Sequence, residues 1–300
     1  MIASKPDKQV IQLDNIDKEV DLFICSDVHY DSLKCDRKSF KAHLDHIKAI
    51  DGKVLIVGDL FDVMGCYKDP RSKSADIDPR YIVRDRSYLD VVLDDVYEFL
   101  KPYRENILMV SYGNHETAIL RHRDTDITDR LVYLLNQDSE FKTQKGAYAG
   151  WVYLKLYPNI TNSRKLATFR IAYHHGKGGN AKRSKGILYS QLDAMEYPDA
   201  NMIVSGHDHN KIYDPSNVRR RMGYQKSIYT YKDTVHWLKT GSYKKSADDF
   251  GWEVEKGFTP KRLGGWFVNL RQSRRTFVRD KKTTEMYVVT PTVTEAVPVF

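Results

Sequence analysis

The sequence has little cysteine and no long apolar run, and both absences narrow the class of protein that it encodes. Its 300 residues include only three cysteines, an odd number without the spacing of a zinc site. One of them, Cys25, lies within an apolar segment, which predicts a buried thiol. No run of 18 apolar residues is present, so we expect no membrane-spanning helix. Residues 1–20 lack the apolar core of a signal peptide, and we therefore expect a cytoplasmic protein.

Nucleotide-binding loops and internal repeats are also missing. The glycine-rich segment 176–181 matches neither a P-loop nor a dinucleotide fingerprint. Hydrophobic residues nevertheless make up 41% of the chain, enough to bury a sizeable core. We expect a single domain over residues 1–300, with an insertion at about 65–86 and a basic C-terminal extension from about 271.

Charge is distributed unevenly along the chain. Residues 1–150 carry 22 Lys and Arg against 27 Asp and Glu, a net charge of −5. Residues 151–300 carry 26 against 13, a net charge of +13. The basic half would attract a polyanion such as a nucleic acid, although a solvated basic surface would have the same composition.

Strand-like and helix-like segments alternate in the first two thirds of the chain, which predicts an α/β fold. The predicted strands are 21–26, 53–57 and 107–110, and the predicted helices are 38–50, 87–100 and 126–136, the last with Thr128 as its cap. A predicted antiparallel pair follows at 151–157 and 166–173. A helix at 187–195 and strands at 202–204, 227–231, 235–239, 265–270 and 286–289 complete the prediction.

Five polar motifs follow the ends of these apolar strands. They are Asp27-Val-His29, Gly58-Asp59-Leu-Phe-Asp62, Gly113-Asn114-His115-Glu116, His174-His175-Gly176 and Gly206-His207-Asp208-His209. Asp27 and His29 are one residue apart, so in an extended chain they project to one side and can chelate one ion. The carboxylate of Asp59 can bridge two cations. Nitrogen and oxygen ligands suit manganese, iron or zinc, and two such ions about 3.5–4 Å apart would activate water and clamp a phosphoryl oxygen.

In this order the motifs resemble those of the calcineurin-like metallophosphoesterase superfamily, whose pattern is D-x-H, G-D-x-x-D, G-N-H-D/E, H and G-H-x-H. They span residues 27–209, about 60% of the chain. The resemblance implies a four-layer α/β/β/α sandwich of two mixed sheets flanked by helices. It also implies two divalent transition-metal ions at the strand ends, manganese first, with iron, zinc or nickel as alternatives.

The resemblance also assigns roles to single residues. The first ion would be held by Asp27, His29 and His209, the second by Asn114, His175 and His207, with Asp59 bridging the two. His115 would contact phosphate and donate a proton, and Asp62 would orient His115. Either His174 or His175 could be the ligand of the fourth motif, because adjacent residues of a strand face opposite sides. The position directly before glycine favours His175.

The resemblance implies a hydrolase of phosphoesters, and the basic half favours a phosphodiesterase or nuclease acting on DNA or RNA. Substrate-binding candidates follow the fourth motif: Lys177, Lys182, Arg183 and Lys185. The arginines at 219–221 and after 270 could extend that surface. Phosphoprotein phosphatases of this superfamily carry arginine where this chain has Val63 and Tyr112, which argues against phosphoserine recognition by that route. A phosphomonoesterase is the alternative. A non-catalytic binding module is a third, less favoured because the ligand set and His115 are intact.

Overall fold

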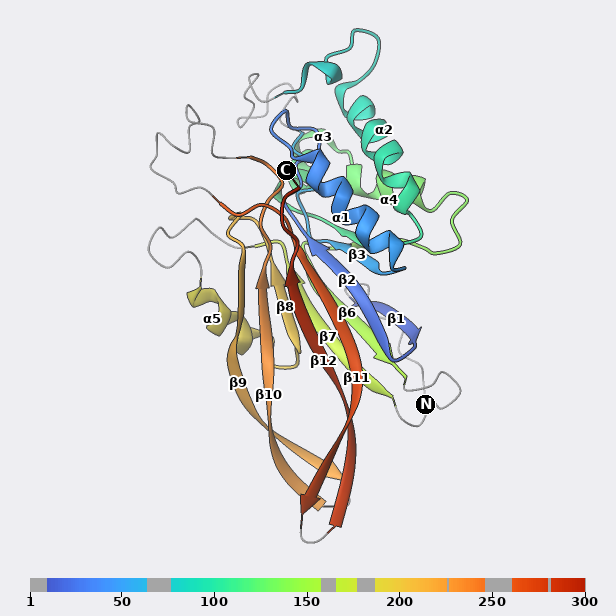
Figure 1. Ribbon diagram of the computed structural model, residues 1–300. Coiled ribbons are helices and arrows are strands. Elements are labelled where there is room, and N and C mark those ends of the chain that lie inside the picture. Colours follow the sequence, from blue (N-terminus) through green and yellow to red (C-terminus); the bar gives the residue numbers. More distant parts are fainter. Residues whose placement is uncertain are drawn as a thin grey trace.

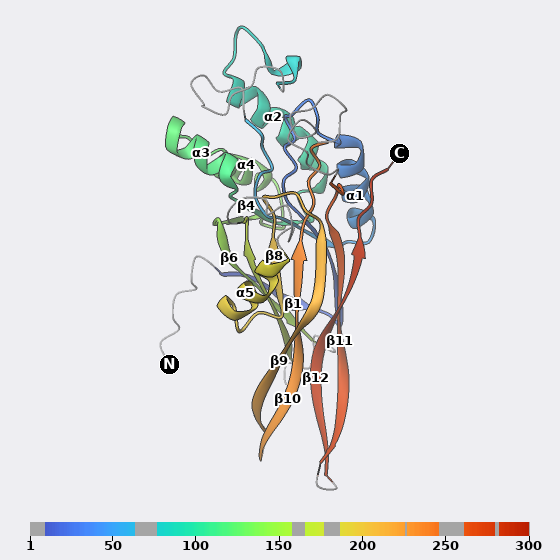
Figure 2. The same ribbon diagram turned by 90° about the vertical axis from the view of Figure 1, so that its left-hand side faces the viewer.

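The computed structural model of the chain describes residues 10–63, 77–157, 166–176, 187–225, 227–245, 261–279 and 282–299. In this part of the chain, two mixed six-stranded sheets pack face to face, and helices cover both outer faces of the pair (Figure 1, Figure 2). This is the four-layer α/β/β/α sandwich that the resemblance implies. None of the described helices is long and apolar enough to cross a membrane.

The first sheet holds the strands of the first three motifs. Its order is β12-β11-β2-β3-β4-β5, and the last four strands are parallel to one another. Their bounds are β2 Glu19–Cys25, β3 Lys53–Ile56, β4 Ile107–Ser111, β5 Gln144–Gly146, β11 Trp266–Arg279 and β12 Lys282–Glu295. The ends of β2, β3 and β4 that lead into the motifs are almost wholly buried, as expected for parallel strands covered on both faces.

Four helices accompany this sheet, and their apolar sides form one buried cluster with its outer face. They are α1 Arg37–Ala49, α2 Tyr88–Leu100, α3 Asn114–Arg123 and α4 Ile127–Leu135. In α1, Phe40, Leu44 and Ile47 recur at helical spacing and are fully buried. The predicted cap of α4 is wrong: the Asp126 side chain accepts the hydrogen bond from the Asp129 amide, and Thr128 lies inside the helix.

The second sheet holds the strands of the last two motifs, in the order β1-β6-β7-β8-β10-β9. Their bounds are β1 Val10–Ile16, β6 Ala149–Leu156, β7 Ala167–His174, β8 Met202–Ser205, β9 Ile212–Gln225 and β10 Ser227–Lys239. The predicted pairing of 151–157 with 166–173 is confirmed as the antiparallel β6–β7 pair. Helix α5, Leu188–Glu196, lies beside β9 and β10 on the outer face.

Apolar side chains from both sheets meet between them, among them Ile24, Leu55, Met109, Ile171 and Val204. This shared core fixes the two sheets against each other. The strand ends that carry the motifs therefore open at one common edge.

Two long hairpins, β9–β10 and β11–β12, extend past the other strands at the end opposite to α1 and α2 (Figure 1). The strands predicted at 227–231 and 235–239 are one continuous strand, β10. The extension predicted from about 271 begins inside β11. Of the insertion predicted at 65–86, residues 65–76 lie outside the described part of the chain. Residues 77–86 include a short 3-10 helix, Pro79–Tyr81, anchored by the Tyr81 hydroxyl 2.6 Å from Asp95.

Candidate metal centre

The ends of β2, β3 and β4 from one sheet and of β7 and β8 from the other bring their motifs together. Potential ligand atoms lie within 4.8 Å of one another in three groups: Asp27, His29 and His209; Asp59, His175 and His207; His29, Asp62 and His115. The first two groups correspond to the two ligand sets implied by the motifs. The structure therefore assembles buried His and Asp clusters consistent with a dimetal site.

Asp27 lies at the centre of the first group. Its Oδ2 atom accepts hydrogen bonds from the Ser26 hydroxyl and from the His207 amide, the latter at 2.9 Å. Its Oδ1 atom is buried and has no hydrogen-bond partner among the described residues. That atom lies 3.3 Å from Nε2 of His209 and 3.9 Å from Nε2 of His175. A buried carboxylate oxygen facing imidazole nitrogens, with no donor of its own, fits a metal ligand.

The second group is built around His175, which is fully buried. Its Nδ1 atom lies 2.9 Å from the carbonyl oxygen of Val57, and this bond directs Nε2 into the cluster. Nε2 is 3.1 Å from Oδ2 of Asp59 and 3.1 Å from Oδ1 of Asn114. Nδ1 of His207 lies 2.8 Å from the same Asn114 oxygen. An amide oxygen, a carboxylate and two imidazoles thus converge on one point.

His174 does not join these groups. Its Nε2 atom lies 3.2 Å from Asp193 in α5, on the outer side of the second sheet. The two adjacent histidines face opposite sides of the chain, as the strand alternation requires. The geometry brings His175, and not His174, to the cluster.

His115 and Asp62 lie at the rim of the first group. Nδ1 of His115 is 2.5 Å from the main-chain carbonyl of Asp62 and 3.8 Å from its carboxylate. The Asp62 carboxylate is closer to His29, with 2.9 Å between Oδ1 and Nδ1. Asp62 therefore contacts His115 mainly through its carbonyl, whereas the sequence prediction had the carboxylate orient it. Nε2 of His115 lies 3.8 Å from Asp59.

Backbone strain is concentrated at this edge. Of the described residues other than glycine with positive φ, five are candidate ligands: Asp27, His29, Asp59, His207 and His209. Asp and His tolerate this left-handed conformation better than most residues, but each instance costs about 1–3 kcal/mol. The surrounding contacts must therefore hold these turns in place.

The motif glycines allow the two sheets to approach each other. Gly58 has a φ of 78°, and a Cβ atom there would collide with the His175 ring and lie 2.7 Å from Cα of Gly113. A Cβ at Gly113 would collide with Asp59. Neither position can accept a side chain without moving a candidate ligand.

Two buried carboxylates, whose role was not predicted from the sequence, hold the loop after β3. Glu116 accepts hydrogen bonds from the amides of Asp59, Phe61 and Gly113 at 2.7–3.1 Å. Asp31 accepts from the amides of Asp62 and Val63 at 2.6 and 2.8 Å. Glu116 stood in the third motif, but nothing in the sequence indicated that its partners were main-chain amides of another motif.

The segment after β10, residues 240–245, supports the site from the basic half. The Ser242 hydroxyl donates to the Asp27 carbonyl at 2.8 Å, and the Tyr243 amide donates to the same oxygen at 3.0 Å. Nζ of Lys244 lies 3.1 and 3.2 Å from the two oxygens of Asp62. No motif marked this segment, because its side chains support the ligand loops and are not ligands themselves.

The charges of the cluster favour a bound cation. Burial disfavours a charged imidazole, but the carboxylates of Asp59 and Asp27 outweigh it and raise the pKa of His175 to about 10. Burial alone would raise the pKa of Asp27, but His175 and His209 lower it to about 2. Burial and the charge of Asp59 raise the pKa of Glu116 to about 7. Closely spaced carboxylates thus draw positive charge into the cluster, and the donor set fits divalent metal ions.

The predicted substrate-binding residues Lys177, Lys182, Arg183 and Lys185 lie outside the described residues. Arg219 forms a partly exposed ion pair with Asp233, with its guanidinium nitrogens 2.7 and 2.9 Å from the two carboxylate oxygens. Its neighbour Arg220 is exposed.

A family model for calcineurin-like phosphoesterases matches residues 21–211 of the chain. No curated protein matches the sequence. Among solved structures, Vps29 from Entamoeba histolytica complexed with zinc is similar at 12% identity, covering 90% of this chain and 99% of that chain with a TM-score of 0.34. A predicted phosphoesterase from Streptococcus pneumoniae is similar at 12% identity, with coverages of 90% and 98% and a TM-score of 0.32. GAP50, the anchor in the inner membrane complex of Plasmodium, is similar at 13% identity, with coverages of 89% and 88% and a TM-score of 0.40.

Proposed function

Because the chain belongs to the calcineurin-like phosphoesterase family, we propose that it hydrolyses phosphoesters with the help of two divalent metal ions. One observation supports this proposal most strongly. The buried Oδ1 atom of Asp27 has no hydrogen-bond partner among the described residues, yet it faces imidazoles from two other motifs. An arrangement of this kind would be costly unless a cation satisfied it.

In the proposed site, Asp27, His29 and His209 would hold one ion, Asn114, His175 and His207 would hold the other, and Asp59 would contribute to both. Such ions supply a water of lowered pKa and stabilise the charge that develops on phosphorus oxygens. Manganese is our first choice, because the ligands are nitrogen and oxygen atoms without thiolate, and iron, zinc and nickel remain alternatives.

His115 is proposed to protonate the leaving oxygen. Its Nδ1 atom donates to the Asp62 carbonyl, so in the imidazolium the second proton resides on Nε2. Nε2 lies on the side of Asp59, within reach of a group bound at the cluster. Asp62 holds both His115, through its carbonyl, and His29, through its carboxylate.

The proposed substrate is a phosphodiester, and within that class a nucleic acid. The support is the net charge of +13 that residues 151–300 carry, with 26 Lys and Arg against 13 Asp and Glu, in the half that contributes His175, His207 and His209. A phosphomonoester of a nucleotide or small metabolite is the alternative. Lys177, Lys182, Arg183 and Lys185 are proposed to contact the phosphate backbone.

A panel of substrates tests the proposal. The protein, loaded with manganese, is assayed on p-nitrophenyl phosphate, bis-p-nitrophenyl phosphate, single-stranded DNA, duplex DNA and RNA. We expect hydrolysis of the diesters and a steep fall in nucleic-acid affinity with salt, because each neutralised phosphate releases counterions. Hydrolysis of the monoester alone would establish the alternative, and no hydrolysis of any substrate with both ions bound would overturn the proposal.

A further inference from the structure

Strand β8 is much shorter than β7 and β10, the two strands that it separates in the second sheet (Figure 1). It pairs with β7 only from Ile171 onwards and with β10 only from His236 onwards. Before these positions, β7 begins at Ala167 and β10 begins at Ser227, and no strand of the described chain lies between them. The second sheet therefore has a gap at the end that points away from the candidate metal centre.

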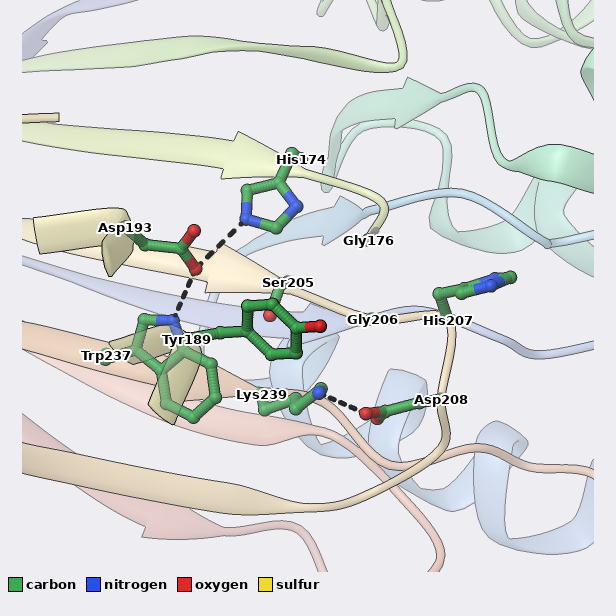
Figure 3. Close-up of a pocket in the computed structure, with 10 residues that line it drawn as sticks. All are labelled: His174, Gly176, Tyr189, Asp193, Ser205, Gly206, His207, Asp208, Trp237 and Lys239. Carbon is green, nitrogen blue, oxygen red and sulfur yellow. Dashed lines mark hydrogen bonds and ion pairs between the residues drawn. The ribbon is translucent and has the colours of Figure 1, made fainter. Parts of the chain in front are cut away.

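A large cleft occupies this gap. It measures about 900 Å³ for the centre of a water molecule. Residues 166–170 line one side, residues 230–234 line the other, and residues 287–291 of β12 contribute from the first sheet. Where β8 is present, by contrast, a cavity of only about 20 Å³ remains beside α5, which is room for one water-sized group (Figure 3). The cleft thus exists because β8 begins late.

The two strand edges along the cleft present main-chain groups to it. Immediately before β8, the amide of Arg170 donates to the side-chain oxygen of Asn201, and the amide of His236 donates to the Asn201 carbonyl, both at 3.0 Å. Main-chain groups of a strand point alternately to its two edges, so the amides of Thr168 and Thr234 face the cleft. Within the described part of the chain, no strand pairs with these edges at that point.

These edges lack the protection that the long outer edges of the two sheets have. β9 and β12 lie at sheet edges, and each contains a proline, Pro215 and Pro291, a residue that hinders pairing with a further strand. Segments 167–170 and 230–234 contain no proline. They can therefore accept an added strand, which is one of the recurring ways in which proteins bind extended peptides.

Basic side chains determine which kind of chain fits the cleft. Arg170 and Lys232 line it, and neither forms an ion pair with another residue that the structure describes. The acidic side chains in the described lining, Asp199 and Asp233, lie 3.4 and 3.6 Å from the guanidinium of Arg221. Because the acidic side chains already have partners and these two basic ones do not, the cleft favours an anionic chain.

The position of Lys232 in the sheet also favours an anionic partner. Lys232 lies directly opposite Arg220 in the β9–β10 pair, and both residues are exposed. Like charges directly opposite each other on two strands are unfavourable. The neighbouring Arg219, by contrast, is opposite Asp233 and forms an ion pair with it. A carboxylate bound in the cleft would reduce the repulsion at Lys232.

We propose that the cleft binds an extended, acidic segment of a partner protein, which adds a strand between β7 and β10. Main-chain hydrogen bonds to both flanking strands supply affinity, and carboxylates near Arg170 and Lys232 supply specificity. Apolar side chains of the segment pack against β12, where Val289 contacts the core between the sheets. A single-stranded nucleic acid would match the charge but could not pair with strand edges. This binding requires neither metal ions nor hydrolysis, so it is independent of the proposed function.

The first test measures binding of a blocked, fluorescent hexapeptide of alternating valine and glutamate by anisotropy. The double variant Arg170→Gln/Lys232→Gln should bind it at least about fivefold more weakly than the wild-type protein, because two partly exposed ion pairs are lost. Arg121→Gln/Lys38→Gln removes one exposed arginine and one exposed lysine outside the cleft and is the matched control, which should bind like the wild type. Thermal unfolding checks both variants, and the single variant Lys232→Gln, at an exposed position, serves if the double variant does not fold.

The second test asks whether the peptide binds as a strand. The same hexapeptide with N-methyl groups on alternate residues loses the donors of one edge and should bind at least about tenfold more weakly. Hydrogen exchange of the Thr168 and Thr234 amides, followed by NMR, should slow when the unmodified peptide binds. Equal affinity of the methylated peptide, or unchanged exchange of both amides, would overturn strand addition.

The remaining outcomes concern the site and the class of partner. No binding of the acidic peptide at concentrations up to about 1 mM would overturn the proposal, and so would equal affinity of the cleft variants and the wild-type protein. A single-stranded DNA oligonucleotide is measured in parallel. If it bound more tightly than the peptide and lost affinity in the cleft variants but not in the control, the cleft would serve a nucleic acid and the peptide proposal would be wrong.

Discussion

The two halves of the chain hold their ligand loops in opposite ways. In the acidic half, the buried carboxylates of Glu116 and Asp31 accept hydrogen bonds from main-chain amides of the loop after β3. In the basic half, lysines donate to the loop after β8: Lys239 binds the side chain of Asp208, and Lys261 binds its carbonyl at 3.0 Å. Some of the lysines that make this half basic therefore stabilise a loop of the site.

Some of the basic residues that produce the net positive charge are already paired with carboxylates. Lys211 has no exposed side-chain surface and lies 3.2 Å from Glu295, and Lys244 is bound to Asp62. Basic residues committed in this way cannot also neutralise a nucleic-acid backbone. The electrostatic support for a polyanion comes from the basic residues that remain exposed, such as Arg220.

The largest expected effect on activity comes from Asp59, the proposed bridging ligand. Asp59→Asn should weaken both ions and abolish hydrolysis while leaving the fold largely intact, because the Asp59 carboxylate lies 3.1 Å from Nε2 of His175 in one group and interacts electrostatically with His29 of the other. Elemental analysis and the diester assay measure this. Full two-metal occupancy in this variant would contradict the bridging role.

The next largest effect concerns the ligand that the basic half contributes after β7. His175→Ala should lose most of the activity together with one metal ion, whereas His174→Ala should retain both ions. Metal content and kcat/KM on bis-p-nitrophenyl phosphate give the ranking. If the order of the two variants were reversed, His174 would take over the role of ligand.

His115→Asn separates chemistry from metal binding. The variant should keep both ions and bind substrate, but lose a factor of about 10²–10⁴ in kcat on a natural ester, the usual contribution of a general acid. The loss should shrink on a p-nitrophenyl ester, whose leaving group departs without much protonation. Unchanged turnover on the natural ester would remove His115 from the mechanism, and loss of metal would make it a ligand.

The smallest expected effects are on stability, and they compare support by a buried carboxylate with support by a lysine. Glu116→Gln replaces one acceptor oxygen with a donor facing main-chain amides, and should lower the free energy of unfolding by about 1–3 kcal/mol. Lys244→Met removes a partly exposed partner of Asp62 and should lower it by about 1 kcal/mol or less. Denaturant unfolding of both variants measures the difference. A larger loss for Lys244→Met would mean that the lysine carries more of the support than its exposure indicates.

The α/β character of the fold and the positions of the motifs could be predicted because their signals are local, whereas the four-layer arrangement and the ligand assignments followed from the resemblance to the family. Asp27, Asp59 and Asn114 each follow a short apolar strand, and the ends of parallel strands meet at one edge. The supporting contacts of Asp31 and Lys244 could not be predicted, since their partners lie elsewhere in the chain and have no sequence signature. They can be identified only once the loops are placed in space.

The hairpin of β9 and β10 shows a second limit of prediction from the sequence. The arginine run at 219–221 gave no alternation of apolar and polar residues, and β9 was missed for that reason. Its strand pairing places Arg219 opposite Asp233, which turns an apparent surface charge into an ion pair. Strand register decides such pairings, and a single sequence does not specify register where no face is clearly apolar.

The position of the candidate metal centre between the two sheets has a mechanical consequence. An ion held by Asp59 from the first sheet and by His175 and His207 from the second would act as a cross-link between the layers, in addition to side-chain packing and hydrogen bonds such as that from the His207 amide to Asp27. Removal of the ions by a chelator would then leave the left-handed turns at the candidate ligands less restrained. The two sheets would separate first at the edge that carries these turns. Hydrogen exchange should accordingly rise at the ends of β3 and β8 before it rises in the shared core, and added metal should restore protection in proportion to its occupancy.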